Sequence, residues 1–319
     1  MEKYIFAVIA LTAFLISALI GPVIIPILHR LKFGQEIREI GPSWHKKKSG
    51  TPTMGGFIFI ISVILVTLIF AGDKTSIFIL IFSLIFAAIG FADDFIKVIL
   101  KRNLGLTEKQ KSLLQLLASL AFAYSALHFD ITDTSVIIPF VKTTLELPKW
   151  FYIIFTVFVV VGASNSVNLT DGVDGLASLV TVVVCLFFAL IAYMMQNYSI
   201  AAFNIINAAA LIGFYIYNRH PARVFMGDTG SLYLGAVVCF SAIALKLPII
   251  LIIAGGVYVF ETLSVIIQVA SFKLTGKRVF KMSPFHHHLE MCGWSERKIV
   301  FAFSLATLIL CIISYFACV

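Results

Sequence analysis

Five acidic side chains lie where long apolar segments of the chain end, and they are the residues best suited to chemistry. They are Asp93, Asp94, Asp171, Asp174 and Asp228. Carboxylates at the edge of hydrocarbon are costly to keep, so a function is the default explanation for them. Because spaced Cys or His partners are missing, their hard oxygens favour Mg²⁺ or Mn²⁺ over zinc. A helix cap or an ion pair with Lys would explain any single Asp but does not suit all five together.

The spacing of four of these acids predicts how they can act. Asp93 and Asp94 are neighbours on a predicted helix, where adjacent side chains point about 100° apart. At most one of them should therefore face a given ligand directly. Asp171 and Asp174 are three residues apart, so they share a face if a helix begins near Leu169. That face would form an acidic cup.

Asp228 lies in Gly227–Ser231, a turn-forming segment that opens a predicted helix. Free backbone N–H groups at such a helix start suit a phosphate oxygen, so a metal ion and a phosphate would both fit there. Mg²⁺ typically takes one or two protein carboxylates. The remaining acids are then available as a general base or as hydrogen-bond acceptors for a substrate.

Two further segments could supply positive charge or hydrogen bonds. Gly41–Gly56 joins Lys46–Lys48 to a turn rich in Gly, Pro and Thr, and from charge alone a membrane anchor explains it better than a binding site does. Pro284 disfavours a helix passing into His286–His288, and three consecutive His cannot share one helical face. Hydrogen bonding to phosphate suits these His better than a transition metal, because other soft ligands are missing.

The composition identifies the class of protein. The chain has 319 residues, 60% hydrophobic and 13% charged, with a mean hydropathy of +1.02. No soluble globular domain needs such values, so we predict an all-α polytopic integral membrane protein. Residues 1–319 are expected to form one transmembrane domain, because no linker or repeat divides them. Ten apolar runs are long enough to suggest membrane helices: Tyr4–Leu28, Met54–Ala71, Ser76–Phe91, Ser112–Phe129, Trp150–Ala163 (expected to continue past Ala163), Leu176–Met195, Ile200–Tyr217, Ser231–Leu245, Ile249–Phe272 and Ile299–Cys318.

Loop charge predicts the orientation of these helices. Alternate loops leave only Lys3, Lys74, Lys142, Lys149 and Lys246 on one side, and the rest of the 24 Lys and Arg residues on the other. Basic residues gather on the cytoplasmic side of membrane proteins. Ten spans then place both termini outside and every acidic motif at the cytoplasmic face.

Other segments predict local structure. Asp130–Lys149 is rich in β-branched residues around Pro139 and predicts a small external β-hairpin. The ninth run contains Gly255, Gly256, Glu261 and Gln268 and is longer than a crossing needs. It is either a bent helix beside a lipid groove or a plainly tilted one with Glu261 paired in the bundle. The five cysteines form no C-x-x-C pair, and neither a P-loop nor a Rossmann glycine pattern occurs.

Taken together, the motifs resemble those of a known family. The Gly50–Gly56 loop, Ala92–Asp94, Asn168–Gly172, Phe225–Asp228 and His286–His288 follow one another as in the polyprenyl-phosphate N-acetylhexosamine-1-phosphate transferases. Within that superfamily the chain looks most like the phospho-N-acetylmuramoyl-pentapeptide transferases. The features that favour this branch are the complete Thr51–Met54 loop, the Lys273–Arg278 segment and the three unbroken His.

The resemblance implies a reaction, a cofactor and a location. It implies transfer of phospho-MurNAc-pentapeptide from UDP-MurNAc-pentapeptide to undecaprenyl phosphate, giving lipid I and UMP with Mg²⁺, the first membrane step of peptidoglycan synthesis. The enzyme would lie in the bacterial cytoplasmic membrane, among membrane lipid, with a homodimer possible and no nucleic-acid partner. A pyrophosphate exchange between a soluble nucleotide and a lipid must take place at the interface, which agrees with the acidic and basic residues found there.

The resemblance also implies roles for individual residues, carried over onto the matching positions. Asp228 would bind Mg²⁺, Asp93 would deprotonate the lipid phosphate, and Asp94 would support the metal or that phosphate. The remaining implied substrate contacts are Lys46, Asp174 and Phe225 for uridine; Thr51, Asn168, Asp171 and Gly227 for the sugar and phosphate region; Lys97, Lys109, Asn218, His286, His287 and His288 for phosphates; and Gln268 beside the lipid groove.

Two other functions remain open from the sequence. A GlcNAc-1-phosphate transferase would share most of these motifs, although the His triplet argues against it. A cation or proton transporter also keeps carboxylates inside a helical bundle, but it needs them near the midplane, where only Glu261 could lie.

Overall fold

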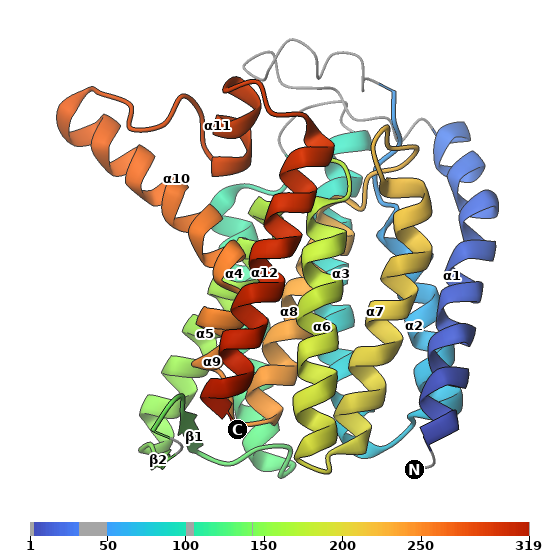
Figure 1. Cartoon of the computed structure of the whole chain (residues 1–319), viewed down its shortest axis with the longest axis vertical. Coiled ribbons are helices and arrows are strands. Elements are labelled where there is room, and N and C mark those ends of the chain that lie inside the picture. Colours follow the sequence, from blue (N-terminus) through green and yellow to red (C-terminus); the bar gives the residue numbers. More distant parts are fainter. Residues whose placement is uncertain (1–2, 32–49, 100–104, 142, 319) are drawn as a thin grey trace.

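Long apolar segments form helices along the whole chain, and one small β-hairpin interrupts them (Figure 1). The computed structural model describes residues 3–31, 50–99, 105–141 and 143–318. In chain order the elements are α1 (Lys3–Arg30), α2 (Gly56–Phe70), α3 (Lys74–Ile99), α4 (Glu108–His128), β1 (Ser135–Ile138), β2 (Thr143–Glu146), α5 (Lys149–Thr170), α6 (Leu176–Met194), α7 (Tyr198–Asn218), α8 (Gly227–Ala244), α9 (Ile250–Ala254), α10 (Gly256–Thr275), α11 (Phe285–Met291) and α12 (Glu296–Cys318).

Eight of the described helices are long and apolar enough to cross a membrane: α1, α3, α5, α6, α7, α8, α10 and α12. The fold is therefore that of a helical multi-pass membrane protein, as predicted. Helix α2 is apolar but has only 15 residues, and α4 has 21 residues with Glu108, Lys109 and Lys111 in its first turn. All ten predicted apolar runs correspond to helices, the ninth being divided between α9 and α10. Helix α1 begins and α12 ends at the same end of the bundle (Figure 1).

Helix α8 lies at the centre, packed by α3, α5 and α6. Glycines allow this close approach: a Cβ at Gly56 of α2 would lie 2.6 Å from the Cα of Gly230, and one at Gly90 of α3 would overlap the backbone of Asp228. Small residues at helix contacts are typical of membrane bundles, because they let backbones come close. The packing therefore brings the end of α3 against the start of α8, where three of the predicted acids lie.

The end of α5 and the start of α6 both agree with the predicted runs. Helix α5 continues past Ala163 to Thr170, as expected from its polar continuation. Helix α6 begins at Leu176, as the sixth apolar run predicted, directly after Gly175, whose φ of 82° is left-handed. The start near Leu169 that would put Asp171 and Asp174 on one helical face does not occur. Residues 171–175 therefore form a turn between two helices.

The ninth apolar run is bent, as one of its two predicted forms required. Gly255 separates α9 from α10, and α10 leads away from the bundle as an arm, with α11 lying above its base (Figure 1). The second element of the prediction also holds, since Glu261 is fully buried and paired within the protein. Bending and pairing occur together.

The predicted external hairpin is present at the end of the bundle that carries both termini. Strands β1 and β2 are antiparallel, with Ser135 opposite Glu146. The hairpin is tied to the helices by Ile137 N–H, which donates to Lys246 O at 2.8 Å. Burial acts to raise the pKa of Asp133, but Lys246 Nζ at 2.6 Å and hydrogen bonds from Ser135 outweigh it and lower the pKa to about 2.

Candidate active site

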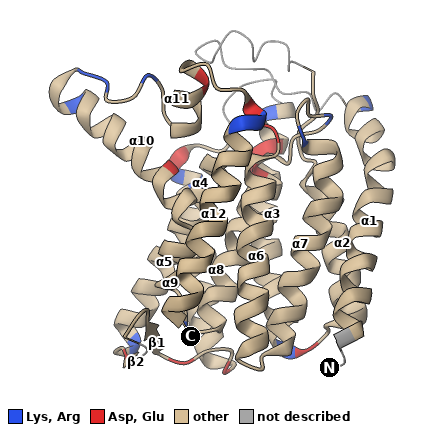
Figure 2. Cartoon of the chain, viewed as in Figure 1, with Lys and Arg blue, Asp and Glu red and all other residues tan. Residues whose placement is uncertain are grey.

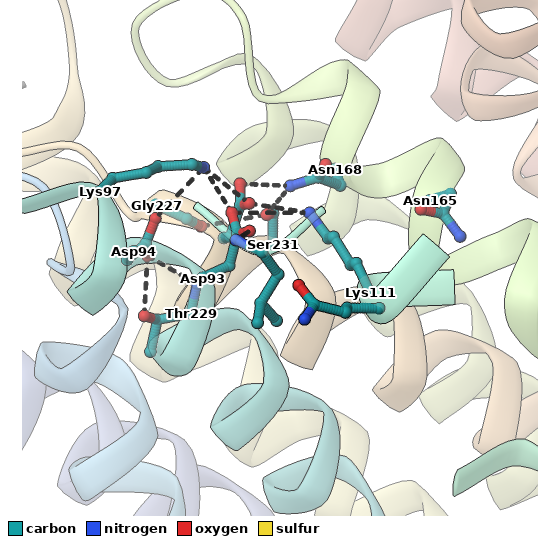
Figure 3. A network of polar contacts seen from close by, with 12 residues as sticks. Asp93, Asp94, Lys97, Lys111, Asn165, Asn168, Gly227, Thr229 and Ser231 are labelled. Carbon is teal, nitrogen blue, oxygen red and sulfur yellow. Dashed lines mark hydrogen bonds and ion pairs between the residues drawn. The ribbon is translucent and has the colours of Figure 1, made fainter. Parts of the chain in front are cut away.

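Three carboxylates converge where α3 ends and α8 begins (Figure 3). One oxygen from each of Asp93, Asp94 and Asp228 lies within 4.8 Å of the others. Both Asp93 and Asp94 therefore lie near enough to Asp228 for all three to reach one ion, while the expectation that at most one of the pair faces a given ligand directly stays a prediction. Gly90 of α3 allows α8 to come this close, because a Cβ there would overlap the backbone of Asp228.

Two lysines neutralise these acids. Lys97 Nζ lies 2.5 Å from Asp93 Oδ2, 3.0 Å from Asp228 Oδ2 and 3.9 Å from Asp94 Oδ1. Lys111 Nζ reaches from α4 to within 2.8 Å of the same Asp228 oxygen. Both ammonium groups are partly buried, so screening by solvent is reduced relative to a surface pair. The five side chains form one alternating cluster of charge, which we call the acid–lysine cluster.

Backbone and neutral polar groups fix the orientation of the carboxylates. Asp94 Oδ2 accepts hydrogen bonds from the backbone N–H and hydroxyl of Thr229 at 2.9 and 2.8 Å. Asp93 Oδ1 accepts one from Leu106 N–H at 2.8 Å. Asn168 Nδ2 lies 2.8 Å from both Asp228 Oδ1 and Ser231 Oγ. Each carboxylate is thus held by a different element, and preorganised groups of this kind stabilise charge without reorganising during a reaction.

The donor set of the acid–lysine cluster fits a hard divalent cation. Its possible ligands are three carboxylates with nearby hydroxyl and amide oxygens, and no thiolate or imidazole joins them among the described residues. Mg²⁺ and Mn²⁺ prefer such oxygens. Asp228 is the most accessible of the three acids, with 17% of its side chain exposed against 4% for the other two.

The 171–175 turn lies on the same side of the bundle but does not form the predicted acidic cup. Asp171 caps the end of α5, and Asp174 is directed to other partners: its Oδ2 accepts from Ala222 N–H at 3.0 Å and lies 3.1 Å from His220 Nδ1. Glu296 Oε2 accepts from the backbone N–H of Asp174 at 3.1 Å. Because α6 begins only at Leu176, the condition for a shared helical face is not met, and the two acids share a turn.

The Gly50–Gly56 loop is attached to the segment that carries Phe225. Phe225 N–H donates to Pro52 O at 2.9 Å, and Phe225 O accepts from Gly55 N–H at 2.8 Å. The pairing brings Thr51 and Phe225, both partly buried, to the edge of the acid–lysine cluster, because Gly227 lies against Thr53 and Asp94. Lys46 lies outside the described residues.

The three histidines take three different directions on α11, as the helical geometry required. His286 is fully buried, with Nδ1 3.2 Å from Glu261 Oε2 and with its backbone N–H 3.2 Å from Glu261 Oε1. His287 Nδ1 lies 2.6 Å from Glu290 Oε2, and His288 Nδ1 accepts from Lys281 N–H at 3.1 Å. No helix passes through Pro284, as predicted, but a short helix that was not predicted, α11, begins directly after it and carries all three histidines.

The ring of His286 fills the space beside Gly172. A Cβ at residue 172 would overlap His286 Nε2 and lie 2.7 Å from Cε1. Neither ring nitrogen of His286 makes a hydrogen bond of good geometry. His286 belongs to α11, and Gly172 belongs to the 171–175 turn, which we call the acid turn. This contact therefore joins α11, at the base of the α10 arm, to the acid turn.

Two of the predicted substrate-binding amides have their polar atoms engaged inside the protein. Gln268 donates to Phe280 O at 2.9 Å and accepts from the N–H groups of Val279 and Phe280 at 3.0 and 2.9 Å. Asn218 accepts from Ser178 Oγ at 2.8 Å and donates to Val224 O at 3.1 Å. Both therefore shape the segments that surround the site.

Sequence reasoning chose Lys109 on α4, whereas the structure brings Lys111 into the cluster and leaves Lys109 exposed. Thr107 caps α4 through a reciprocal bond with Gln110 and so fixes where the helical period starts. Lys111 then lies four residues before buried Gln115, on the inward face, while Lys109 is two residues away and points outward. The four-residue spacing between Lys111 and Gln115, which places both on one face of α4, was the signal in the sequence that could have identified Lys111.

The fold defines a class of protein: a helical multi-pass membrane protein that carries the acid–lysine cluster at one end of its bundle. The family described as glycosyl transferase family 4 matches residues 76–246, more than half of the chain. The phospho-N-acetylmuramoyl-pentapeptide-transferase signature 1 matches residues 48–60, which include the loop attached to Phe225.

Curated relatives cover almost the whole chain. A phospho-N-acetylmuramoyl-pentapeptide-transferase of Clostridium botulinum strain Alaska E43 is 53% identical over 309 residues, which cover 96% of this chain and 94% of the relative. Those of Clostridium acetobutylicum, covering 96% of both chains, and Thermoanaerobacter sp. strain X514, covering 99% of both, are 51% and 49% identical. The chain belongs to the phospho-N-acetylmuramoyl-pentapeptide-transferase family, and it is a transferase.

Proposed function

We propose that this transferase moves phospho-MurNAc-pentapeptide from UDP-MurNAc-pentapeptide to undecaprenyl phosphate, giving lipid I and UMP. The observation that carries the proposal is the acid–lysine cluster at one end of a membrane bundle. Its ammonium groups suit the phosphates of both substrates, and its carboxylates suit a metal and a proton acceptor. The names of the relatives specify the sugar and peptide of the donor.

We further propose that the bundle crosses the membrane ten times, with both termini outside and the acid–lysine cluster on the cytoplasmic side. Ten apolar runs that each coincide with a helix support this count, and so do the two termini at one end (Figure 1). The distribution of Lys and Arg supports the orientation. Donor and acceptor would then meet at the surface of the inner leaflet.

Direct attack of the lipid phosphate suits the arrangement of the residues. A lipid phosphate oxygen forms a bond to the phosphorus that carries the sugar, and the bond from that phosphorus to the UMP oxygen breaks. Asp93 would take the proton of the lipid phosphate, Lys97 and Lys111 would hold the phosphates, and Asp94 would steady the start of α8 through Thr229. A bound Mg²⁺ on Asp228 would neutralise charge on the transferred group.

The reaction is tested by release of UMP from UDP-MurNAc-pentapeptide by purified protein, with and without undecaprenyl phosphate. We expect release only with both substrates, and no comparable turnover of UDP-GlcNAc. Release from UDP-GlcNAc alone would assign the chain to the other branch of its superfamily. A transporter is disfavoured by Glu261, whose carboxylate is occupied by His286 and its backbone N–H.

Removal of divalent cations is expected to abolish UMP release, because only a hard cation would offset the charge that builds on the transferred phosphate. Titration with EDTA followed by addition of Mg²⁺ or Mn²⁺ measures the loss and recovery. Zn²⁺ should restore little, since the donors are oxygens. Activity that persists in EDTA would contradict the assignment of Asp228 as a metal ligand.

Lys111→Gln should lower kcat about 10²-fold, because it removes an ammonium group 2.8 Å from Asp228. Lys109→Gln is the matched comparison: the same change two residues away, on an exposed side chain, should alter kcat less than about threefold. Initial rates of UMP release measure both. A larger effect at Lys109 would restore the assignment made from the sequence.

Asp93→Asn should remove activity at neutral pH, and activity should stay low as the pH is raised. The reason is that Asp93 also holds Lys97 and Leu106 in place, so it does more than remove a proton. A pH–rate profile for the variant tests the assignment. At high pH the lipid phosphate has already lost its proton, so recovery of activity there would mean that Asp93 transfers the proton but does not position other groups. Full activity of the variant at neutral pH would exclude Asp93 as the base.

A further inference from the structure

The tip of the α10 arm carries a concentration of positive charge that the proposed reaction does not use. Lys273, Lys277 and Arg278 are all exposed there. No Asp or Glu occurs in the sequence between Glu261 and Glu290. Figure 2 accordingly shows blue along the end of α10 and the loop that follows it, with no red on that stretch. We call residues 272–281 the arm tip.

Large apolar side chains lie among these cations. Phe272, Leu274 and Val279 are 54%, 84% and 55% exposed. Water alone does not suit such a surface, because exposed apolar patches normally mark a partner or a membrane. Hydrocarbon alone does not suit it either, because each cation would lose its hydration. The boundary between the two satisfies both kinds of side chain.

The arm tip is held in shape by its own hydrogen bonds. The amide of Gln268 binds the backbone of Val279 and Phe280 through three hydrogen bonds, and Ser271 Oγ donates to Lys277 O at 2.9 Å. Lys281 Nζ donates to Met291 O at 3.0 Å, which anchors the far end. Lys273 is therefore presented by the last turn of α10, and Lys277 and Arg278 by a folded loop, which lowers the entropy lost on binding.

We propose that the arm tip is a docking surface for the phosphate headgroups of anionic phospholipids. The cations meet the phosphates while Phe272, Leu274 and Val279 enter the acyl region beneath them. Each basic residue near an anionic surface favours contact about fivefold, so three together favour it on the order of 10²-fold. Such contact would set the position of α10, and with it Glu261 and His286 at the arm's base. The proposal concerns bulk lipid and does not depend on the transfer reaction.

Lipid proximity at the arm tip tests the proposal. The full chain carrying Leu274→Cys, with Cys292 and Cys318 replaced by Ser, is labelled with a bimane dye and placed in nanodiscs. The discs contain phosphatidylcholine with a minor share of phosphatidylglycerol, and one of the two lipids is brominated to quench the dye. We expect brominated phosphatidylglycerol to quench at least about threefold more than its mole share predicts.

Two variants separate charge from shape. Adding K273Q/K277Q/R278Q should reduce quenching to the mole share, while adding K273R/K277R/R278K, which keeps all charges, should retain the preference. Quenching at the mole share in the parent protein, or a preference unchanged by the triple Gln variant, would overturn the proposal. Loss of the preference on adding equimolar undecaprenyl phosphate would also overturn it, because the surface would then be an acceptor site.

Discussion

Asp228→Asn is expected to lower kcat for UMP release by about 10³-fold or more. The change removes one negative charge from a carboxylate that is joined to Lys97, Lys111 and Asn168 by contacts of 3.0, 2.8 and 2.8 Å. The two ammonium groups then face an amide, and the proposed Mg²⁺ loses its most accessible ligand. KM for the donor should change much less than kcat.

The matched control is Asp133→Asn at the opposite end of the bundle. Asp133 also pairs with a lysine, Lys246 at 2.6 Å, but it is largely exposed and far from the acid–lysine cluster along the helices. Its loss should change kcat less than about twofold, because exposed pairs contribute little. If Asp228→Asn kept more than a tenth of the parent kcat in the same membranes, the central position given to Asp228 would be wrong.

The sequence predicted the fold well because hydrophobicity alone selects membrane helices. Each apolar run became a helix, the hairpin formed around Pro139, and the ninth run broke at Gly255. The start of α6 at Leu176 was predicted correctly from the sixth apolar run, but the sequence left open a helix start near Leu169, since apolar and polar content could not show that Gly175 adopts a left-handed φ of 82°. Backbone conformation at a single glycine therefore decided whether Asp171 and Asp174 share a helix or a turn.

The candidate site was predicted in its residue types but not in all of its contacts. The structure brings five of the predicted site residues together: Asp93, Asp94, Asp228, Lys97 and Asn168. The family resemblance allowed this group to be predicted although its members lie far apart in the chain. The partners of Asp94 and Asp174 depend on tertiary packing, which no single sequence states. Thr229, His220 and Glu296 were missed for that reason.

Sequence also could not tell a side chain that touches substrate from one that holds the site. Asn218 and Gln268 were assigned to substrate, yet each has its amide engaged with the protein. His286 was assigned to a phosphate and is fully buried against Glu261 and Gly172. Its position favours a structural link between the arm and the acid turn.

Gly172→Ala is expected to lower kcat about 10²-fold by forcing the acid turn and α11 apart. The new Cβ would overlap His286 Nε2, and the ring cannot turn aside because it is buried and held next to Glu261. Displacement of substrate-positioning residues by about 1 Å can cost this much without any loss of a reacting group. Rates of UMP release and a thermal unfolding midpoint should be measured together, to separate displacement from unfolding.

Shortening residue 286 distinguishes two roles for His286: packing that links α11 to the acid turn, or direct contact with the transferred phosphate. If His286 acts by filling the space beside Gly172, His286→Ala makes room for the new methyl group, and the Gly172→Ala/His286→Ala double variant should be more active than Gly172→Ala alone. If His286 instead contacts the transferred phosphate, its loss should multiply the loss at Gly172, and the double variant should be the least active of the three. Residues in contact give such non-additive cycles, whereas independent ones do not. Glu261→Gln provides the third comparison, because it keeps an acceptor for the His286 backbone N–H and should leave the outcome of the cycle unchanged.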